Sequence, residues 1–236
     1  MKFLLMILTD EKAEGELSPG ARDEIVARHG AVTRELRAAG ALVGAGRLSF
    51  SNEATTIRRR GDAYVTVDGP FAETREVFGG FYLIDAASRA EAIAWAQKLP
   101  LREGGAIEIR PARTGATWRG KVLAAKRFLV AFIADTTRPQ SRDQVFRAID
   151  AHYELSLDLA ARGMFVASRA LEPAATGTTL RWRDGAHVVT DGPFAESKEF
   201  VAGYFVIACD SKDEAIAWAK PLMAGSAACE VRPVWE

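Results

Sequence analysis

The chain has 236 residues, 48% of them hydrophobic, and it carries 31 basic and 31 acidic side chains. This length is enough for one well-buried core or for two compact domains. A formal net charge of zero provides no overall attraction to nucleic acid or to an anionic membrane surface, and no apolar run approaches membrane-spanning length. We therefore expect neither direct nucleic-acid binding nor membrane binding.

The first half of the chain reads as strands and helices in turn. Residues 3–8 read as an apolar strand. The run is short and no cleavage pattern follows it, so it does not indicate a signal peptide. Ser18 and Pro19 indicate a helix start, with Ser18 as the N-cap, and Gly40 ends that helix. Strands are then expected at residues 41–48, 55–59 and 64–67, the last two forming a hairpin.

A tight corner follows the hairpin at residues 68–73, which read DGPFAE. Pro70 fixes its own backbone angle and lacks an N–H, while Gly69 tolerates angles that other residues avoid. Asp68 is placed to accept hydrogen bonds from backbone N–H groups two residues on. The pattern leaves two roles open for Asp68, which either caps its own turn or presents a rigid carboxylate to a cleft.

The rest of the first half is one more strand, one helix and a last strand. The strands are expected at residues 78–84 and 106–110, and Ser88 with Glu91 forms a capping box that opens the helix between them. The resulting order of strand, helix, strands, helix, strand is that of the split βαβ, or ferredoxin-like, fold. In such a fold two helices cover one face of the sheet, and the other face is apolar and needs a partner.

The second half of the chain repeats the first. DGPFAE returns at residues 191–196, and an offset of 123 residues carries Asp68 to Asp191 and His29 to His152. We therefore predict an α+β fold of two tandem ferredoxin-like domains, residues 1–113 and 126–236, joined by a linker at 114–125. We expect the second domain to cover the open sheet of the first as an intrachain pseudo-dimer, and further homo-oligomerisation stays open.

Both halves also share a set of sequence motifs. These are a helix ending in Ala-Gly or Arg-Gly, the DGPFAE corner, a Gly- and aromatic-rich strand, and an EAIAWA helix, at residues 39–40 and 162–163, 68–73 and 191–196, 80–82 and 203–205, and 91–96 and 214–219. With these motifs each half resembles the YCII-related, DGPF-domain family over almost its full length. The resemblance implies a dimeric α/β-barrel arrangement, a bacterial cytoplasmic setting and, in some members, association with an extracytoplasmic-function sigma factor.

The resemblance further implies a pocket in which a histidine of the first helix meets the aspartate of the corner. Carried onto this chain, the catalytic pairs are His29 with Asp68 and His152 with Asp191. A histidine oriented by a carboxylate can move a proton near neutral pH, which is worth roughly 10² to 10⁴ in rate. The alternative is a histidine that lies exposed on a helix or caps a neighbour.

Other candidate residues surround the corners. The charged residues after each corner form weak surface ion pairs or bind a polar substrate. Of the aromatic residues in each Gly-rich strand, one is expected in the core and another in a pocket. The substrate-binding candidates are Glu73, Arg75, Tyr82, Glu196, Lys198 and Phe205. His187, which corresponds to Tyr64, is expected to be structural or a pocket wall.

No phosphate loop, nucleotide fingerprint, Ser or Cys nucleophile motif or metal-ligand cluster is visible, so we expect no cofactor. Cys209 and Cys229 indicate buried thiols in a reducing cytoplasm. The main hypothesis is a cofactor-independent small-molecule enzyme with His/Asp acid-base chemistry. The alternatives are a non-catalytic ligand-binding or regulatory module with a sigma factor as partner, and a scaffold in which the corner is purely structural.

Overall fold

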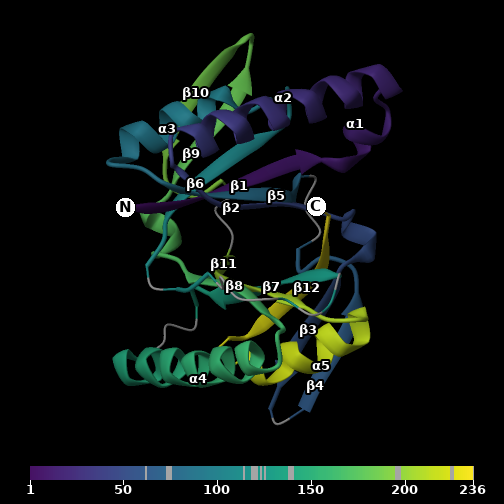
Figure 1. The fold of residues 1–236 in the computed structure, drawn as a ribbon, viewed down its shortest axis with the longest axis vertical. Coiled ribbons are helices and arrows are strands. Elements are labelled where there is room, and N and C mark those ends of the chain that lie inside the picture. Colours follow the sequence, from purple (N-terminus) through teal and green to yellow (C-terminus); the bar gives the residue numbers. More distant parts are fainter. Residues whose placement is uncertain are drawn as a thin grey trace. The chain divides into compact units, whose positions relative to one another are not determined.

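The computed structural model describes residues 1–61, 63–72, 76–113, 115–117, 122, 124, 126–137, 141–194, 198–223 and 226–235. The chain divides into two compact units (Figure 1). Unit 1 comprises Met1–Arg47, Thr74–Arg113 and Glu172–Glu196, and unit 2 comprises Leu48–Glu73, Thr114–Leu171 and Ser197–Glu236. Each unit therefore combines most of one repeat with a segment of the other.

Among the described residues, unit 1 is built on six strands with antiparallel neighbours. Its strand order is β10-β9-β6-β1-β5-β2. The strands are β1 (Lys2–Asp10), β2 (Leu42–Leu48), β5 (Glu76–Asp85), β6 (Ala106–Pro111), β9 (Thr178–Arg183) and β10 (Ala186–Asp191). The helices are α1 (Glu11–Gly15), α2 (Pro19–Ala38) and α3 (Arg89–Lys98), with a 3₁₀ turn at Ala174–Thr176.

Unit 2 has the same arrangement with the roles of the repeats reversed. Its strand order is β4-β3-β12-β7-β11-β8, again with antiparallel neighbours. The strands are β3 (Thr55–Arg60), β4 (Ala63–Asp68), β7 (Arg127–Asp135), β8 (Phe165–Ala170), β11 (Glu199–Ala208) and β12 (Ala228–Trp235). The helices are α4 (Arg142–Ala161) and α5 (Lys212–Leu222), with a 3₁₀ turn at Ser51–Glu53.

Four consecutive strands of each unit follow the ferredoxin-like order. In unit 1 the order β6-β1-β5-β2 places the first and third strands of the motif in the middle of the four. The predicted mixed fold, a largely antiparallel sheet with helices, is thus confirmed. The packing of the domains as a pseudo-dimer or barrel stays a prediction.

The hairpins are exchanged between the repeats. Hairpin β9–β10 of the second repeat pairs with β6 of the first, and hairpin β3–β4 of the first repeat pairs with β12 of the second. The hairpins themselves were predicted from the sequence, but their exchange was not. Turn chemistry determines that a hairpin forms, whereas its edge partner depends on the tertiary structure.

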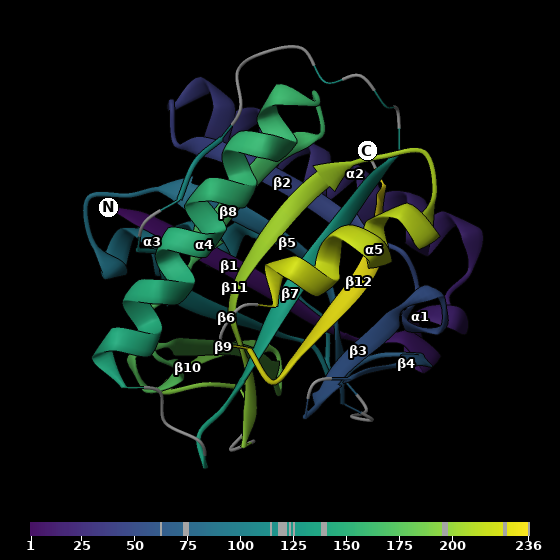
Figure 2. The same cartoon turned by 90° about the horizontal axis from the view of Figure 1, so that it is seen from below.

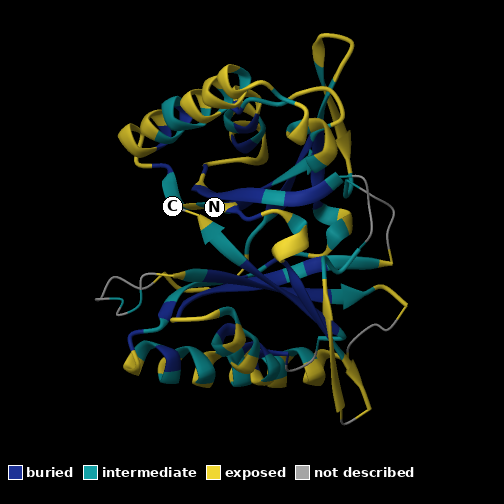
Figure 3. Ribbon diagram, turned by 90° about the vertical axis from the view of Figure 1, so that its right-hand side faces the viewer, coloured by how far each residue is buried: buried dark blue, intermediate teal, exposed yellow. Residues whose placement is uncertain are grey.

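Helices cover one face of the sheet in each unit (Figures 1 and 2). In unit 1, Phe3 and Leu5 of β1 pack in one cluster with Val32 and Leu36 of α2. In unit 2 an equivalent cluster joins β7, β11 and β12 to α4 and α5. Figure 3 shows the central strands buried and the outer helix faces exposed, as the alternation of apolar residues along the strands requires.

The predicted helix ends are largely confirmed. The Ser18 hydroxyl accepts a hydrogen bond from the Ala21 N–H at 3.3 Å, and Gly40, with φ of 67°, follows the end of α2. Of the two hydrogen bonds in the capping box predicted at Ser88 and Glu91, one is confirmed and the other is wrong. Ser88 does accept from the Glu91 N–H, but the Glu91 carboxylate accepts from the N–H one residue before Ser88.

Two further findings bear on the sequence predictions. Both cysteines are buried free thiols, and burial raises the pKa of each to about 12, so they are protonated at neutral pH.

Among the helices that the structure describes, none is long and apolar enough to cross a membrane.

Candidate functional site

The glycine of each DGPF corner has a backbone angle that only glycine adopts readily. Gly69 has φ of 108° and Gly192 has φ of 99°. The Gly69 N–H donates to the Ala54 carbonyl, and the Gly192 N–H donates to the Gly177 carbonyl, both at 2.8 Å. The corner therefore depends on glycine for its backbone conformation.

We predict that Gly192→Ala lowers the free energy of unfolding by about 1–3 kcal/mol, the usual cost of a strained backbone angle. A Cβ at this position meets no atom within 4 Å, so the loss reflects the backbone angle and not a clash. Gly20→Ala, also in open space but on a helix, is the control and should be neutral or stabilising by roughly 0.4–1 kcal/mol. Urea unfolding of both variants measures the difference, and equal effects would contradict the prediction.

The main chain of the phenylalanine in each corner is hydrogen-bonded to charged side chains of the sheet. In unit 1 the Phe194 N–H donates to Glu108 Oε2 at 3.0 Å, and the Arg181 guanidinium donates to the Phe194 carbonyl at 2.5 Å. Glu108 in turn accepts from Arg110 Nε at 2.9 Å. The corner thus holds the exchanged hairpin against β6.

Unit 2 has the same construction. The Phe71 N–H donates to Glu230 Oε2 at 2.9 Å, and Arg58 donates to the Phe71 carbonyl at 2.9 Å. Glu230 is ion-paired with Arg232. Both halves therefore use a Glu-x-Arg pair of the last strand, so this part of the DGPF motif has a structural role.

The two corner aspartates are exposed. Asp68, in unit 2, accepts a hydrogen bond from the Thr55 hydroxyl at 3.4 Å. Asp191, in unit 1, lies 3.9 Å from the Arg89 guanidinium, and 93% of its side chain is exposed. Solvent screens a contact of this kind, so it adds little to stability.

His29 belongs to a hydrogen-bonded cluster in unit 1. Its Nδ1 lies 3.2 Å from the Tyr82 hydroxyl, which is 3.2 Å from the Thr33 hydroxyl. Thr33 also donates to the His29 carbonyl at 2.8 Å. Two turns of α2 and strand β5 thus hold the half-buried imidazole in one orientation.

The surroundings of His29 keep its ring neutral. Burial, followed by the positive charges of Arg47 and Arg28, lowers the pKa of His29 to about 4. Burial also raises the pKa of Tyr82, so its hydroxyl keeps the proton. At pH 7 the cluster therefore offers a neutral imidazole and a phenol, both able to donate and accept hydrogen bonds.

His152 occupies the equivalent position in unit 2 but has different neighbours. Its Nε2 donates to the Leu222 carbonyl at 2.6 Å, and its ring stacks on Phe132 at 4.9 Å between centroids. Phe205, which stands where the first repeat has Tyr82, contacts the ring edge at 5.6 Å. Burial lowers the pKa of His152. This histidine is packed against the core of its unit.

The predicted His/Asp pairs are each divided between the units. His29 is in unit 1 and Asp68 in unit 2, while His152 is in unit 2 and Asp191 in unit 1. Their pairing stays a prediction.

The six substrate-binding candidates differ in how the structure places them. Tyr82 lies in the His29 cluster, and Phe205 lies in the core of unit 2. Lys198 is exposed, and its carbonyl accepts from the Thr136 N–H at 2.8 Å. Glu73, Arg75 and Glu196 lie outside the described residues. Binding of a substrate by any of the six stays a prediction.

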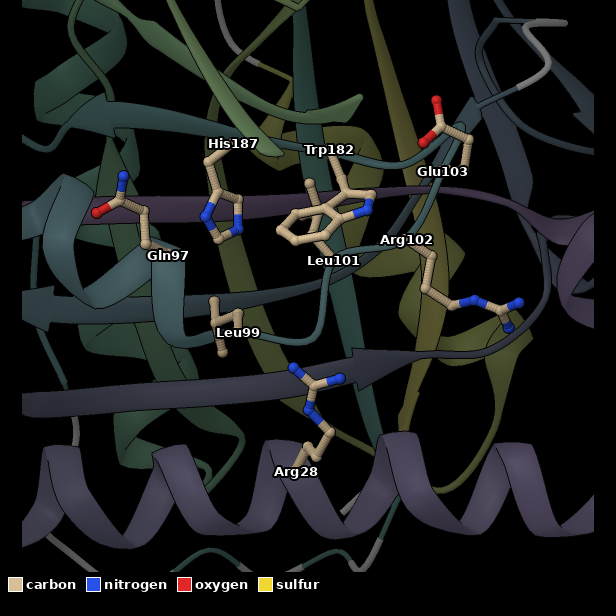
Figure 4. A pocket seen from close by; sticks show the side chains of 8 residues that line it. All are labelled: Arg28, Gln97, Leu99, Leu101, Arg102, Glu103, Trp182 and His187. Atoms are coloured by element: carbon tan, nitrogen blue, oxygen red, sulfur yellow. The ribbon is translucent and has the colours of Figure 1, made fainter. Parts of the chain in front are cut away.

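A cavity of about 290 Å³ lies in unit 1, and Arg28, the helix residue before His29, forms one of its walls (Figure 4). Arg28 approaches it from α2, and Trp182 and His187 approach it from the exchanged hairpin on the opposite side. Gln97 and Leu99 come from the end of α3. His187 was predicted to be structural or a pocket wall, and the structure confirms the second.

The loop between α3 and β6 completes the cavity with Leu101, Arg102 and Glu103. Sequence reasoning missed the cavity because it searched for residues present in both repeats. Arg28 and Trp182 correspond to Ala151 and Arg59, so neither is repeated. A difference between the two copies could have indicated the cavity, because the residue type changes next to His29 and within the hairpin.

Among the residues that the structure describes, no group of three or more histidine, cysteine, aspartate or glutamate side chains could hold a metal ion. The groups that the described part of unit 1 brings together are a neutral imidazole, a phenol and nearby guanidinium groups. This arrangement suits hydrogen bonding to a polar or anionic small molecule.

Comparison with known proteins agrees with the repeat. The model of the YCII-related domain matches residues 1–114 and 129–236. An uncharacterised protein of Rhizobium meliloti (strain 1021) is 34% identical over 113 residues, which cover 47% of this chain and 91% of that relative. The match therefore has the extent of one repeat. The chain belongs to the YCII-related domain family and contains two consecutive copies of that domain.

Proposed function

We propose that the protein is a cofactor-independent small-molecule enzyme whose chemistry is carried by His29 in the first repeat. One observation supports this most directly. His29 is joined to the Tyr82 and Thr33 hydroxyls, whereas His152 is packed against Phe132 and Phe205. The two repeats thus differ in the surroundings of this histidine, and among the described residues it is the ring of His29 that has a hydroxyl group as its hydrogen-bonding neighbour, whereas the ring of His152 has a backbone carbonyl.

The low pKa of His29 determines what the ring does. A free imidazole with a pKa of about 4 is a weak base at pH 7, so it acts first as a neutral hydrogen-bonding group, for example to a substrate carbonyl. A bound anion offsets the charges of Arg47 and Arg28 and raises the pKa of the ring toward neutrality. Substrate binding then converts His29 into an effective base.

The corner aspartate Asp68 completes the proposal as the partner of His29. The test of this part is a double-mutant cycle in turnover with His29→Gln and Asp68→Asn. A pair that acts together gives losses that do not add, whereas independent residues give additive losses.

The main test compares His29→Gln with His152→Gln. A small-molecule library is first screened by thermal shift, and compounds that bind the wild type are assayed for turnover by NMR. We expect His29→Gln to lose roughly 10² to 10⁴ in kcat/KM and His152→Gln to keep most of its activity. Wild-type turnover by His29→Gln would overturn the proposal. The regulatory alternative makes the opposite prediction, a stable complex with a sigma factor and no turnover.

A further inference from the structure

We propose that the cavity of unit 1 binds a small aromatic carboxylate. Since one water molecule in the liquid occupies about 30 Å³, a cavity of about 290 Å³ has room for about ten water molecules. A single aromatic ring with its carboxylate fits into this volume. The inference goes beyond the chemistry proposed for His29 and does not depend on it.

The charges around the cavity favour an anion. Arg28 and Arg102 both line it; Arg28 has no hydrogen-bond or ion-pair partner among the described residues, whereas the charge of Arg102 also acts on Glu14. Figure 4 shows the carboxylate of Glu103, the acidic lining residue, directed away from Arg28. A planar guanidinium matches the two oxygens of a carboxylate, and a carboxylate ligand supplies the partner that Arg28 lacks.

The remaining walls favour a flat apolar body. The Trp182 and His187 rings meet edge to face with centroids 4.8 Å apart, and both lie opposite Arg28 (Figure 4). Leu99, which is buried, and Leu101 add apolar surface. Aromatic rings prefer stacked or edge-to-face neighbours, and the indole N–H and the imidazole remain available as polar contacts. The walls thus suit an aromatic ring better than an aliphatic chain.

Unit 2 provides an internal comparison. The residues equivalent to Arg28, Trp182 and His187 are Ala151, Arg59 and Tyr64. There the Tyr64 hydroxyl donates to the Lys220 carbonyl at 3.3 Å. The helix cation and the indole of the cavity are therefore absent from the equivalent positions, and we assign the site to unit 1 alone.

The probe for the test is benzoate, titrated into the full chain and followed by NMR. The chain has three histidines, so the ring signals of His187 and His152 can be assigned by substitution. We expect saturable shifts of the His187 signals with a dissociation constant of about 1 mM or tighter, and no shift of the His152 signals. Benzamide, which has the same ring without the charge, should bind at least tenfold more weakly. Equal affinity for benzamide, or no saturable shift, would overturn the proposal.

The matched variants exchange residues between the copies. Arg28→Ala and Trp182→Arg each install the residue that unit 2 carries at the equivalent position. Each should weaken benzoate binding at least tenfold. Val26→Ile, a change of the same kind at an exposed site of α2 outside the cavity, should leave binding unchanged. Unchanged binding by both cavity variants would overturn the proposal.

His29→Gln separates this site from the function proposed above. We expect the variant to bind benzoate with wild-type affinity whether or not it turns over a substrate. Failure of the His29 hypothesis would therefore leave the benzoate titration unaffected. Conversely, a loss of benzoate binding in His29→Gln equal to that in Arg28→Ala would show that the cavity is not an independent site and would overturn the inference.

Discussion

Replacing Glu108 by alanine should lower the free energy of unfolding by about 3–5 kcal/mol, as expected when one partner of a buried ion pair is removed. The carboxylate is buried and accepts hydrogen bonds from Arg110 and from the Phe194 N–H. Arg110, which is 1% exposed, loses the carboxylate that balances its charge. The loss should be concentrated at hairpin β9–β10, since this contact holds its corner.

The measurement is urea unfolding, combined with hydrogen exchange of the Phe194 amide. Glu230→Ala should have an effect of the same size in unit 2, because Glu230 binds Arg232 and the Phe71 N–H in the same way. Glu35→Ala is the control. Its exposed ion pair with Lys98 should contribute no more than about 1 kcal/mol. A Glu108→Ala protein as stable as this control would show that the corner is held by other contacts.

The second prediction concerns the dependence of stability on pH. The pKa of His29 is lowered from 6.5 to about 4 in the folded state, so between these values the unfolded chain binds the proton and the folded protein does not. The titration of His29 therefore leaves the free energy of unfolding unchanged above pH 6.5 and lowers it as the pH decreases from 6.5 to 4. The expected loss is about 3 kcal/mol, since each pKa unit corresponds to about 1.4 kcal/mol.

This loss is measured as a difference between wild type and His29→Gln. Urea unfolding of both proteins at a series of pH values removes the contributions of the carboxylates and of His152, which the two proteins share. The wild type should lose about 3 kcal/mol relative to the variant by pH 4. Tyr82→Phe keeps the imidazole buried and should retain most of this dependence. Parallel curves of unfolding free energy against pH for wild type and His29→Gln would contradict the lowered pKa of His29.

The sequence predicted local structure well because local structure depends on neighbouring residues. Ser18 and Gly40 mark the ends of α2, and the hairpins form where turn residues interrupt alternating strands. The corner glycines were predicted from their neighbouring prolines, and positive φ angles are found at both. The error at Glu91 amounts to one residue, because its carboxylate binds the N–H just before the cap.

The candidate site was harder to predict because repeats conserve residues for more than one reason. The sequence drew attention to His29 and His152 together, yet one contacts hydroxyl groups and the other stacks on phenylalanine. The two histidines differ because the second repeat has Phe205 where the first has Tyr82. That each of these residues contacts the histidine of its own unit is known only from the tertiary structure, which packs β5 and β11 against their helices.

The sequence by itself determined that the chain is a duplication, where its strands and helices lie and why each corner requires glycine, because these properties depend on residue order and backbone sterics. Only the tertiary structure decided which sheet receives each hairpin, that Glu108 and Arg110 fasten the corner at Phe194, and that the cavity beside α2 includes Trp182. These features depend on pairing between segments far apart in the chain, and local sequence patterns carry no information about such pairing.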